Sequence, residues 1–126
     1  MSILLQNKVT AFVATTNGEA AKKFYTETLG LRFVEDGPYA LVFDSNGTML
    51  RVQKVKEFTP QPFTALGWNV EDIEAAIKDL TGRGVAMMKL DFLPQDALGI
   101  WTTPDGSKIA WFYDPDGNTL SLAQMV

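Results

Sequence analysis

The chain has 126 residues, 46% of them hydrophobic and 21% charged, and its formal net charge is −4. This length and composition are typical of one soluble globular domain. Acidic residues outnumber basic ones, 15 to 11, and a nucleic-acid surface or a polybasic membrane patch would need clustered Lys and Arg. We therefore expect neither nucleic acid nor a membrane among its partners.

Cysteine and histidine are both absent. This excludes disulfides, thiolate metal sites, a cysteine nucleophile, and imidazole as a ligand or a base. Any metal would need oxygen ligands. Residues 1–5 lack the basic start and the apolar length of a signal peptide, and no run of the sequence reaches the ~18 apolar residues of a membrane-spanning helix. We expect a cytoplasmic protein.

The first half of the chain predicts a strand, a helix and three further strands. The first strand covers 9–14, and Thr16-Asn17-Gly18-Glu19 has the capping-box pattern that opens a helix, which Gly30 ends. β-branched and alternating apolar residues then predict strands at 31–35, 39–43 and 48–53, separated by turns rich in Asp, Asn and Gly.

A polar segment with two prolines, residues 55–63, indicates a linker. After it the pattern begins again with a strand at 65–70 and a helix that Asp72 caps and that Gly82 or Gly84 ends. Further strands are predicted at 85–90, 98–103, 108–113 and 119–124.

The two halves form an internal repeat, with one module at about 8–54 and the other at about 64–125 of a single domain, 1–126. Glu19-Ala20-Ala21 corresponds to Glu74-Ala75-Ala76, and the turn after Asp44 corresponds to the turn after Asp114. Agreement in element order, helix cap and turn together indicates a duplicated βαβββ unit. The same register aligns Arg51 with Ser121.

With these features the chain resembles the vicinal oxygen chelate superfamily, which includes glyoxalase I, extradiol dioxygenases, fosfomycin resistance proteins and bleomycin resistance proteins. The resemblance rests on Phe24-Tyr25-Thr26-Glu27-Thr28-Leu29-Gly30-Leu31, on Val70-Glu71-Asp72-Ile73-Glu74-Ala75-Ala76 and above all on Asp114-Pro115-Asp116-Gly117-Asn118. It implies an α+β fold in which two βαβββ modules form an incomplete barrel around a central cavity, with the helices outside. It also implies a homodimer. Because this fold carries unrelated chemistries, function has to be argued from the site.

The metal-dependent members of this superfamily place four side chains in the cavity, from the first and last strands of each module. Carried over by position, these fall on Thr10, Arg51, Ala65 and Ser121. A cation there would meet a guanidinium, which repels it, and two hydroxyls, which are weak neutral ligands. We therefore expect no metal and no other cofactor.

Strand alternation predicts which other side chains face the cavity once those four are placed inward. This inward set contains Phe12, Ala14, Met49, Gln53, Gly67, Asn69, Thr119 and Ala123, together with Trp111, Tyr113 and Trp101 if Phe112 packs on the helices. The predicted ligand-binding residues are Thr10, Phe12, Arg51, Gln53, Asn69, Trp101, Trp111, Tyr113 and Ser121. Aromatic walls with one cation and a few amides suit a planar or aromatic organic molecule that carries an anionic or carbonyl group.

Several of these residues have a second interpretation. The aromatic pair Trp111 and Tyr113 lines either the pocket or a dimer interface. Arg51 either anchors a ligand or pairs with an internal carboxylate, Glu35 or Asp96, because an inward arginine needs one or the other.

The loop after residue 90 offers a further candidate, since Asp91, Gln95 and Asp96 are either an acid/base group or solvated loop residues. No catalytic residue is assigned. The sequence thus predicts a glyoxalase/bleomycin-resistance-like protein that binds a small aromatic or planar molecule without a metal. The alternative is a lyase, isomerase or dioxygenase of the same superfamily with atypical metal ligands, and a third possibility is an interaction module.

Overall fold

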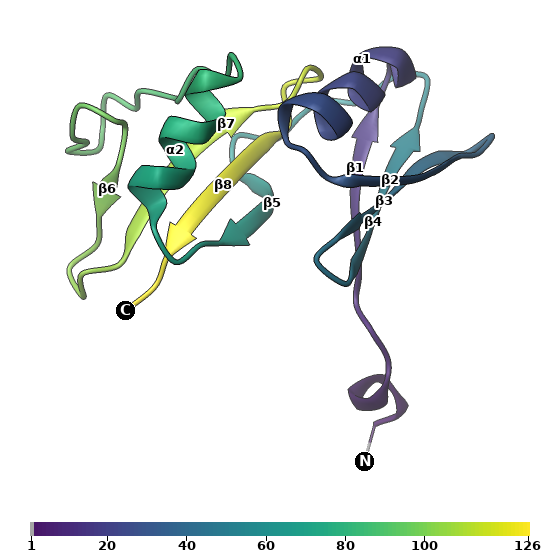
Figure 1. The fold of residues 1–126 in the computed structure, drawn as a ribbon, viewed down its shortest axis with the longest axis horizontal. Helices are drawn as coiled ribbons and strands as arrows, with labels where there is room; N and C mark the ends of the chain where they lie inside the picture. The colour runs from purple at the N-terminus through teal and green to yellow at the C-terminus, as the bar shows by residue number, and fades with distance from the viewer. Residues whose placement is uncertain (1) are drawn as a thin grey trace. The chain divides into compact units, whose positions relative to one another are not determined.

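The computed structural model of the protein describes residues 2–126, which divide into two compact units. The first unit ends at Phe58 and the second begins at Thr59, and each has its own sheet and its own helix (Figure 1). No helix in this part of the chain is both long and apolar enough to cross a membrane. Each unit follows the order βαβββ, so the predicted α+β class and the predicted repeat of elements are confirmed.

The first unit opens with a short 3-10 helix and then forms a four-stranded sheet with one helix. Its sheet has the order β1-β4-β3-β2, in which β1 is parallel to β4 and the other neighbours are antiparallel. The elements are η1 (Ile3–Gln6), β1 (Thr10–Thr15), α1 (Gly18–Lys23), the π-helical turn η2 (Phe24–Thr28), β2 (Arg32–Asp36), β3 (Ala40–Ser45) and β4 (Thr48–Lys54).

One face of this sheet forms the core of the first unit. Tyr25 of η2 is fully buried, and its ring contacts Phe43 of β3 at a centroid distance of 5.7 Å. Leu50 and Val52 of β4 are buried on the same face, because their register partners on β3 are Phe43 and Leu41. Burying such side chains contributes roughly 1.5 to 3 kcal/mol each, so this helix-covered face holds the unit together.

The cap of α1 lies one residue later than the capping-box pattern predicts. The side chain of Asn17, not that of Thr16, accepts a hydrogen bond from the backbone N–H of Ala20 at 3.1 Å. The hydroxyl of Thr15 accepts the N–H of Asn17 at 3.0 Å and so fixes Asn17 in the cap position. The predicted end of the helix is confirmed, because Gly30 follows with φ 71°, a conformation that glycine adopts without strain.

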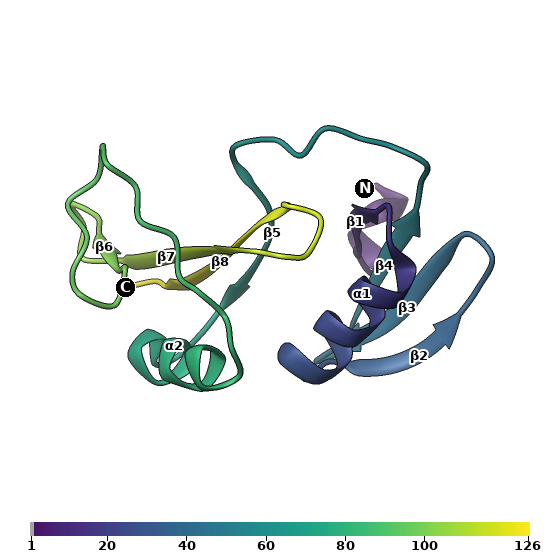
Figure 2. The same cartoon turned by 90° about the horizontal axis from the view of Figure 1, so that it is seen from above.

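The second unit repeats this arrangement with a sheet of order β5-β8-β7-β6, in which β5 is parallel to β8. Its elements are β5 (Thr64–Asn69), α2 (Ile73–Gly82), β6 (Trp101–Thr102), β7 (Lys108–Tyr113) and β8 (Thr119–Gln124). Figure 2 shows α2 lying along one face of this sheet. The buried core between them contains Ile73, Ile77, Leu80, Phe112, Leu120 and Leu122.

The stretch that begins at Asp114 is a tight turn that sets the start of β8. The buried carboxylate of Asp114 accepts the backbone N–H groups of Asp116 and Asn118 at 3.0 and 2.9 Å, and it also accepts the Asn118 side-chain amide at 2.8 Å. Gly117 has φ 87°. These bonds fix the turn, and the predicted bounds of both flanking strands, 108–113 and 119–124, are confirmed.

The strand predicted at 85–90 is wrong. Only an isolated bridge forms there, between Met87 and Phe112. The Gln95 side chain binds the backbone in place of a neighbouring strand, because it accepts the N–H of Leu90 at 2.6 Å and donates to the carbonyl of Met88 at 3.0 Å. A side chain thus satisfies backbone groups that would otherwise need a ladder. The strand predicted at 98–103 shortens to Trp101–Thr102.

Candidate ligand-binding faces

Each sheet has a second face that its helix does not cover, and the predicted site residues lie on these helix-free faces. In the first unit, Phe12 of β1 is the register partner of Arg51 on β4, and Gln53 and Thr10 lie on the same face at the neighbouring positions of their strands. Phe12 is 52% exposed and Arg51 is half-buried. The fold therefore brings Thr10, Phe12, Arg51 and Gln53 together.

Arg51 makes no ion pair or side-chain hydrogen bond within the first unit as described, residues 2–58. Glu35 lies on the same face, since both residues are register partners of Val42, yet no ion pair joins it to Arg51. The other proposed partner, Asp96, uses its Oδ1 atom within its own loop, where it accepts the N–H groups of Leu98 and Ile100 at 2.9 Å each. Within the first unit as described, the guanidinium therefore has no carboxylate partner.

The helix-free face of the second unit carries the remaining predicted residues. Ser121 of β8 has Trp111 of β7 on one side and Gly67 of β5 on the other. Tyr113, 54% exposed, lies opposite Thr119. Asn69 and Trp101 lie on the same face, because Asn69 pairs with Ala123, Trp101 pairs with Ile109, and these two partners pair with each other.

Two tryptophans form a flat aromatic surface on this face. The rings of Trp101 and Trp111 stack with their centroids 6.2 Å apart and their planes inclined by 24°. Both are half-buried. Stacked indoles present a large apolar area of fixed shape, which favours contact with another planar ring.

One correction concerns the start of β5. Thr64 pairs with Thr119 and Leu66 with Leu120, so Ala65 is the extra residue of a β-bulge. In the first unit, Thr10 pairs with Met49. The residue of the second unit that corresponds to Met49 is Thr119, and it pairs with Thr64. The counterpart of Thr10 is therefore Thr64, whereas the sequence predicted Ala65. The hydroxyl of Thr64 accepts the indole N–H of Trp111 at 3.2 Å.

Sequence reasoning missed Thr64 because a bulge depends on the partner strand and leaves no local signature of its own. The signal that could have found it is Gly67, since an isolated glycine within a strand marks a bulge or a close approach of the backbone.

The donor atoms at the four family positions do not suit a divalent metal. The first unit offers the hydroxyl of Thr10 and the guanidinium of Arg51, and the second offers the hydroxyl of Ser121 with either the methyl group of Ala65 or the hydroxyl of Thr64. Such metals bind carboxylates, imidazoles or thiolates, whereas a guanidinium donates hydrogen bonds only. Among residues 2–126 no three carboxylate-bearing side chains gather into a possible metal site.

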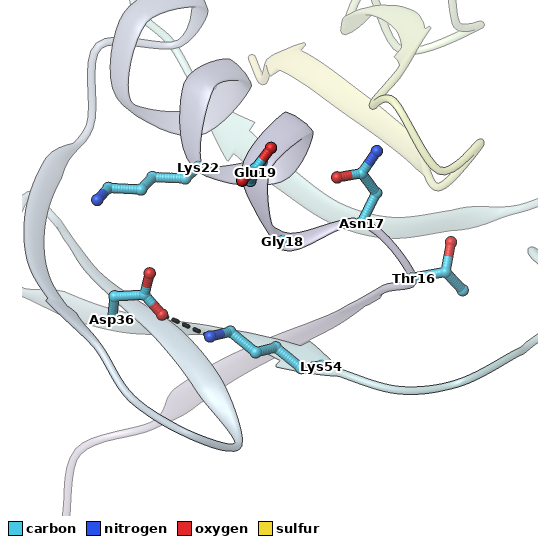
Figure 3. A pocket seen from close by; sticks show the side chains of 7 residues that line it. All are labelled: Thr16, Asn17, Gly18, Glu19, Lys22, Asp36 and Lys54. Carbon is cyan, nitrogen blue, oxygen red and sulfur yellow. Dashed lines mark hydrogen bonds and ion pairs between the residues drawn. The ribbon is translucent and has the colours of Figure 1, made fainter.

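A separate pocket of about 590 Å³ opens beside the start of α1 in the first unit (Figure 3). It is lined by Thr16, Asn17, Gly18, Glu19, Lys22, Asp36 and Lys54. Lys54 crosses it to bind the carboxylate of Asp36 at 2.5 Å and the carbonyl of Gly37 at 2.8 Å. The hydrogen bond from Lys54 holds the pKa of Asp36 below its ordinary value of 3.8. The pair thus joins β4 to the end of β2 at the wall of the pocket, and it stabilises the hairpin formed by β2 and β3.

Two of the three loop residues considered as acid/base candidates, Gln95 and Asp96, make structural hydrogen bonds. Gln95 also donates to the carbonyl of Gly99 at 2.8 Å, so its side chain joins three backbone segments. Asp96 caps the following turn through its bonds to Leu98 and Ile100. Both side chains therefore hold the loop in shape.

A paired βαβββ architecture with matching sheet order defines the glyoxalase-type fold. The profile described as Glyoxalase/Bleomycin resistance protein/Dioxygenase superfamily matches residues 7–122. The chain belongs to this superfamily. A search of curated protein sequences found no match.

Solved structures of similar fold support this assignment. A glyoxalase family protein from Enterococcus faecalis superposes with a TM-score of 0.74 at 23% identity, covering 97% of this chain and 100% of that one. A superfamily member from Sphaerobacter thermophilus superposes with a TM-score of 0.71 at 26% identity, covering 94% of this chain and 98% of that one. A lactoylglutathione lyase from Agrobacterium tumefaciens gives 0.68 at 16%, covering 94% and 92%. At 16% and 23% identity the likeness concerns the fold alone.

Proposed function

We propose that this protein binds a small aromatic or planar organic molecule without a metal. The observation that carries the proposal is the stacked pair Trp101 and Trp111 on the helix-free face of the second unit, with Tyr113 exposed beside it. Indole rings in a fixed stack lose little conformational entropy when a planar ring is added to them.

The first unit supports the same ligand class on its own helix-free face. Phe12 is exposed next to Arg51, so an aromatic ring and a guanidinium lie side by side on neighbouring strands. A guanidinium binds carboxylate or sulfonate oxygens through paired N–H groups. We therefore propose that the ligand carries an anionic or carbonyl group and that Arg51 is the contact for it. Gln53 adds an amide on the same face.

The donor chemistry at Thr10, Arg51, Thr64 and Ser121, which offers no anionic oxygen, supports the proposed metal-free state. The alternative, a lyase, isomerase or dioxygenase with atypical ligands, would need carboxylates on these faces. Glu35 and Asp44 share a face with Arg51, but Asp44 pairs with Arg32 at 3.5 Å. No group of three or more carboxylates that could hold a metal forms among residues 2–126. Metal analysis of the purified protein separates the two candidates.

A thermal-shift screen in EDTA tests the proposal. The probes are 8-anilinonaphthalene-1-sulfonate (ANS), a planar aromatic anion, and N-phenyl-1-naphthylamine, the same ring system without the sulfonate. We expect both to raise the melting temperature, and ANS to raise it more because of Arg51. A library of planar aromatics that leaves the melting temperature unchanged would contradict the proposal, as would turnover that EDTA abolishes.

We also propose a cytoplasmic homodimer. Support for an interface comes from η1, where Ile3, Leu4 and Leu5 are 74 to 78% exposed although Ser2 and Asn7 hold this turn in shape. Ordered apolar side chains of this kind are typical of association surfaces. Sedimentation of the wild-type protein and of an Ile3→Ser/Leu4→Ser/Leu5→Ser variant checks the dimer, and cell fractionation checks the location.

A further inference from the structure

We propose that Thr64 is a positioning residue for ligand binding, because it holds the indole of Trp111 across β8 in line with Trp101. This inference rests on the proposed function and assigns a residue outside the predicted set. Its evidence is the hydrogen bond from the Trp111 indole to the Thr64 hydroxyl and the strand order that this bond crosses.

The bond joins two strands that are not neighbours. Trp111 lies on β7 and Thr64 on β5, with β8 between them. An indole that reaches from one to the other must pass above β8, at the level of Thr119 and Ser121. These two β8 side chains are 5% and 9% exposed, as expected beneath a ring. Trp101 of β6, the neighbour of β7 on the side away from β8, stacks with Trp111.

The β-bulge at Ala65 is what gives Thr64 this position. Residues three apart on a regular strand point to opposite faces, so Thr64 and Gly67 would be on different sides of the sheet. The extra residue corrects the alternation, and a Cβ built on Gly67 would lie 3.7 Å from the Thr64 methyl group. Both residues therefore share the helix-free face, and the hydroxyl meets the indole.

A held indole binds a planar ring more tightly than a free one. If Trp111 could rotate, the ligand would have to order it, and immobilising a side chain costs about 0.5 to 1.5 kcal/mol. By the relation between free energy and affinity this corresponds to a roughly twofold to tenfold change in the dissociation constant. Thr64 would contribute this factor without needing to touch the ligand.

The test compares Thr64→Val, which keeps the shape and removes the hydroxyl, with Thr64→Ser, which keeps the hydroxyl. The first readout uses no ligand: the indole N–H signals of the three tryptophans in an ¹⁵N NMR spectrum, with Trp111 assigned by its loss in Trp111→Phe. The second readout is the dissociation constant for ANS from tryptophan quenching. Circular dichroism checks that both variants fold.

We expect Thr64→Val to shift the Trp111 indole signal and to raise the dissociation constant about twofold to tenfold, and Thr64→Ser to resemble the wild type in both. An unchanged indole signal in Thr64→Val, or a shifted signal with unchanged ANS affinity, would overturn the positioning role. If the wild-type protein does not bind ANS, the proposed function fails and this role falls with it, whereas the indole signal still reports on the hydrogen bond.

Discussion

A side-chain carbon at Gly67 would lie 2.5 Å from the hydroxyl oxygen of Ser121, closer than such atoms approach in proteins. The two residues are register partners on β5 and β8. Glycine in the middle of a strand costs stability because it orders a flexible backbone and packs no side chain. Its presence here is explained by the room that the Ser121 side chain needs beneath Trp111.

The first prediction follows from this contact. Gly67→Ala should lower the free energy of unfolding by about 1 to 2 kcal/mol, because the added methyl group forces Ser121 to move. In a Ser121→Ala background the same substitution should cost less, since the hydroxyl that it meets is gone. Urea denaturation of the four proteins of this double-mutant cycle measures the coupling.

Gly82→Ala is the matched control, because nothing lies within 4 Å of a Cβ at Gly82, in the last turn of α2. That variant should be neutral or more stable by up to about 1 kcal/mol. Equal costs for Gly67→Ala in both backgrounds would mean that Ser121 is not the constraint.

The second prediction concerns Arg51. Arg51→Ala should weaken ANS binding by about 1.5 to 3 kcal/mol, the range of a charge-assisted hydrogen bond, and should leave N-phenyl-1-naphthylamine binding nearly unchanged. Arg32→Ala is the control, since Arg32 is an exposed arginine of β2 that pairs with Asp44 at 3.5 Å. Unchanged ANS affinity together with lowered stability would instead assign Arg51 to an internal role.

The third prediction is a pH dependence at Asp36. The bond from Lys54 lowers the pKa of this carboxyl in the folded state, so the folded protein favours the carboxylate. The stabilisation is therefore present above the unfolded pKa, near 4, and is lost as the pH falls through the lower folded value. The free energies of unfolding of the wild type and of Asp36→Asn, measured by urea denaturation, should differ at pH 6 and become equal in acid.

High salt should reduce the difference at pH 6, because the pair is exposed. Asp91→Asn, on an exposed loop, is the control and should show a smaller difference from the wild type at pH 6. A gap between wild type and Asp36→Asn that persists in acid would show that packing, not charge, is the cause.

The fourth prediction concerns the loop that follows α2. Gln95→Glu keeps the acceptor for Leu90 and loses the two donors to Met88 and Gly99, so it should lower stability by about 1 to 3 kcal/mol. Limited proteolysis should cut this loop faster in the variant. Gln61→Glu, which loses one exposed bond to Thr59, should have a much smaller effect on both measurements.

Local signals predicted most of the fold. The bounds of strands β7 and β8 could be predicted from the sequence because the turn between them is held by one of its own residues. The Asp114 carboxylate accepts the backbone N–H groups of Asp116 and Asn118. The helix of the second unit likewise begins where Asp72 provides the cap for Ala75. Such features depend on residues close in the chain.

The errors arose where a side chain from outside the element, or a partner strand, decides the structure. The apolar run at 85–90 has the pattern of a strand, yet Gln95 occupies the backbone groups of Leu90 and Met88. The bulge at Ala65 exists only in relation to β8. The alternation of side chains along each strand was enough to predict which site residues share a face. The hydrogen bond between Thr64 and Trp111 could not be predicted in this way, because it depends on the order of the strands in the sheet.

The most direct test of metal-free aromatic binding is a fluorescence titration with ANS in EDTA, using two variants. Trp68→Phe retains Trp101 and Trp111, whereas Trp101→Phe/Trp111→Phe retains only Trp68, which pairs with buried Leu122 on the helix-covered face. We predict saturable quenching in the first variant, unchanged when EDTA is omitted, and its loss in the second. No saturable quenching in Trp68→Phe, or binding that EDTA abolishes, would contradict the account.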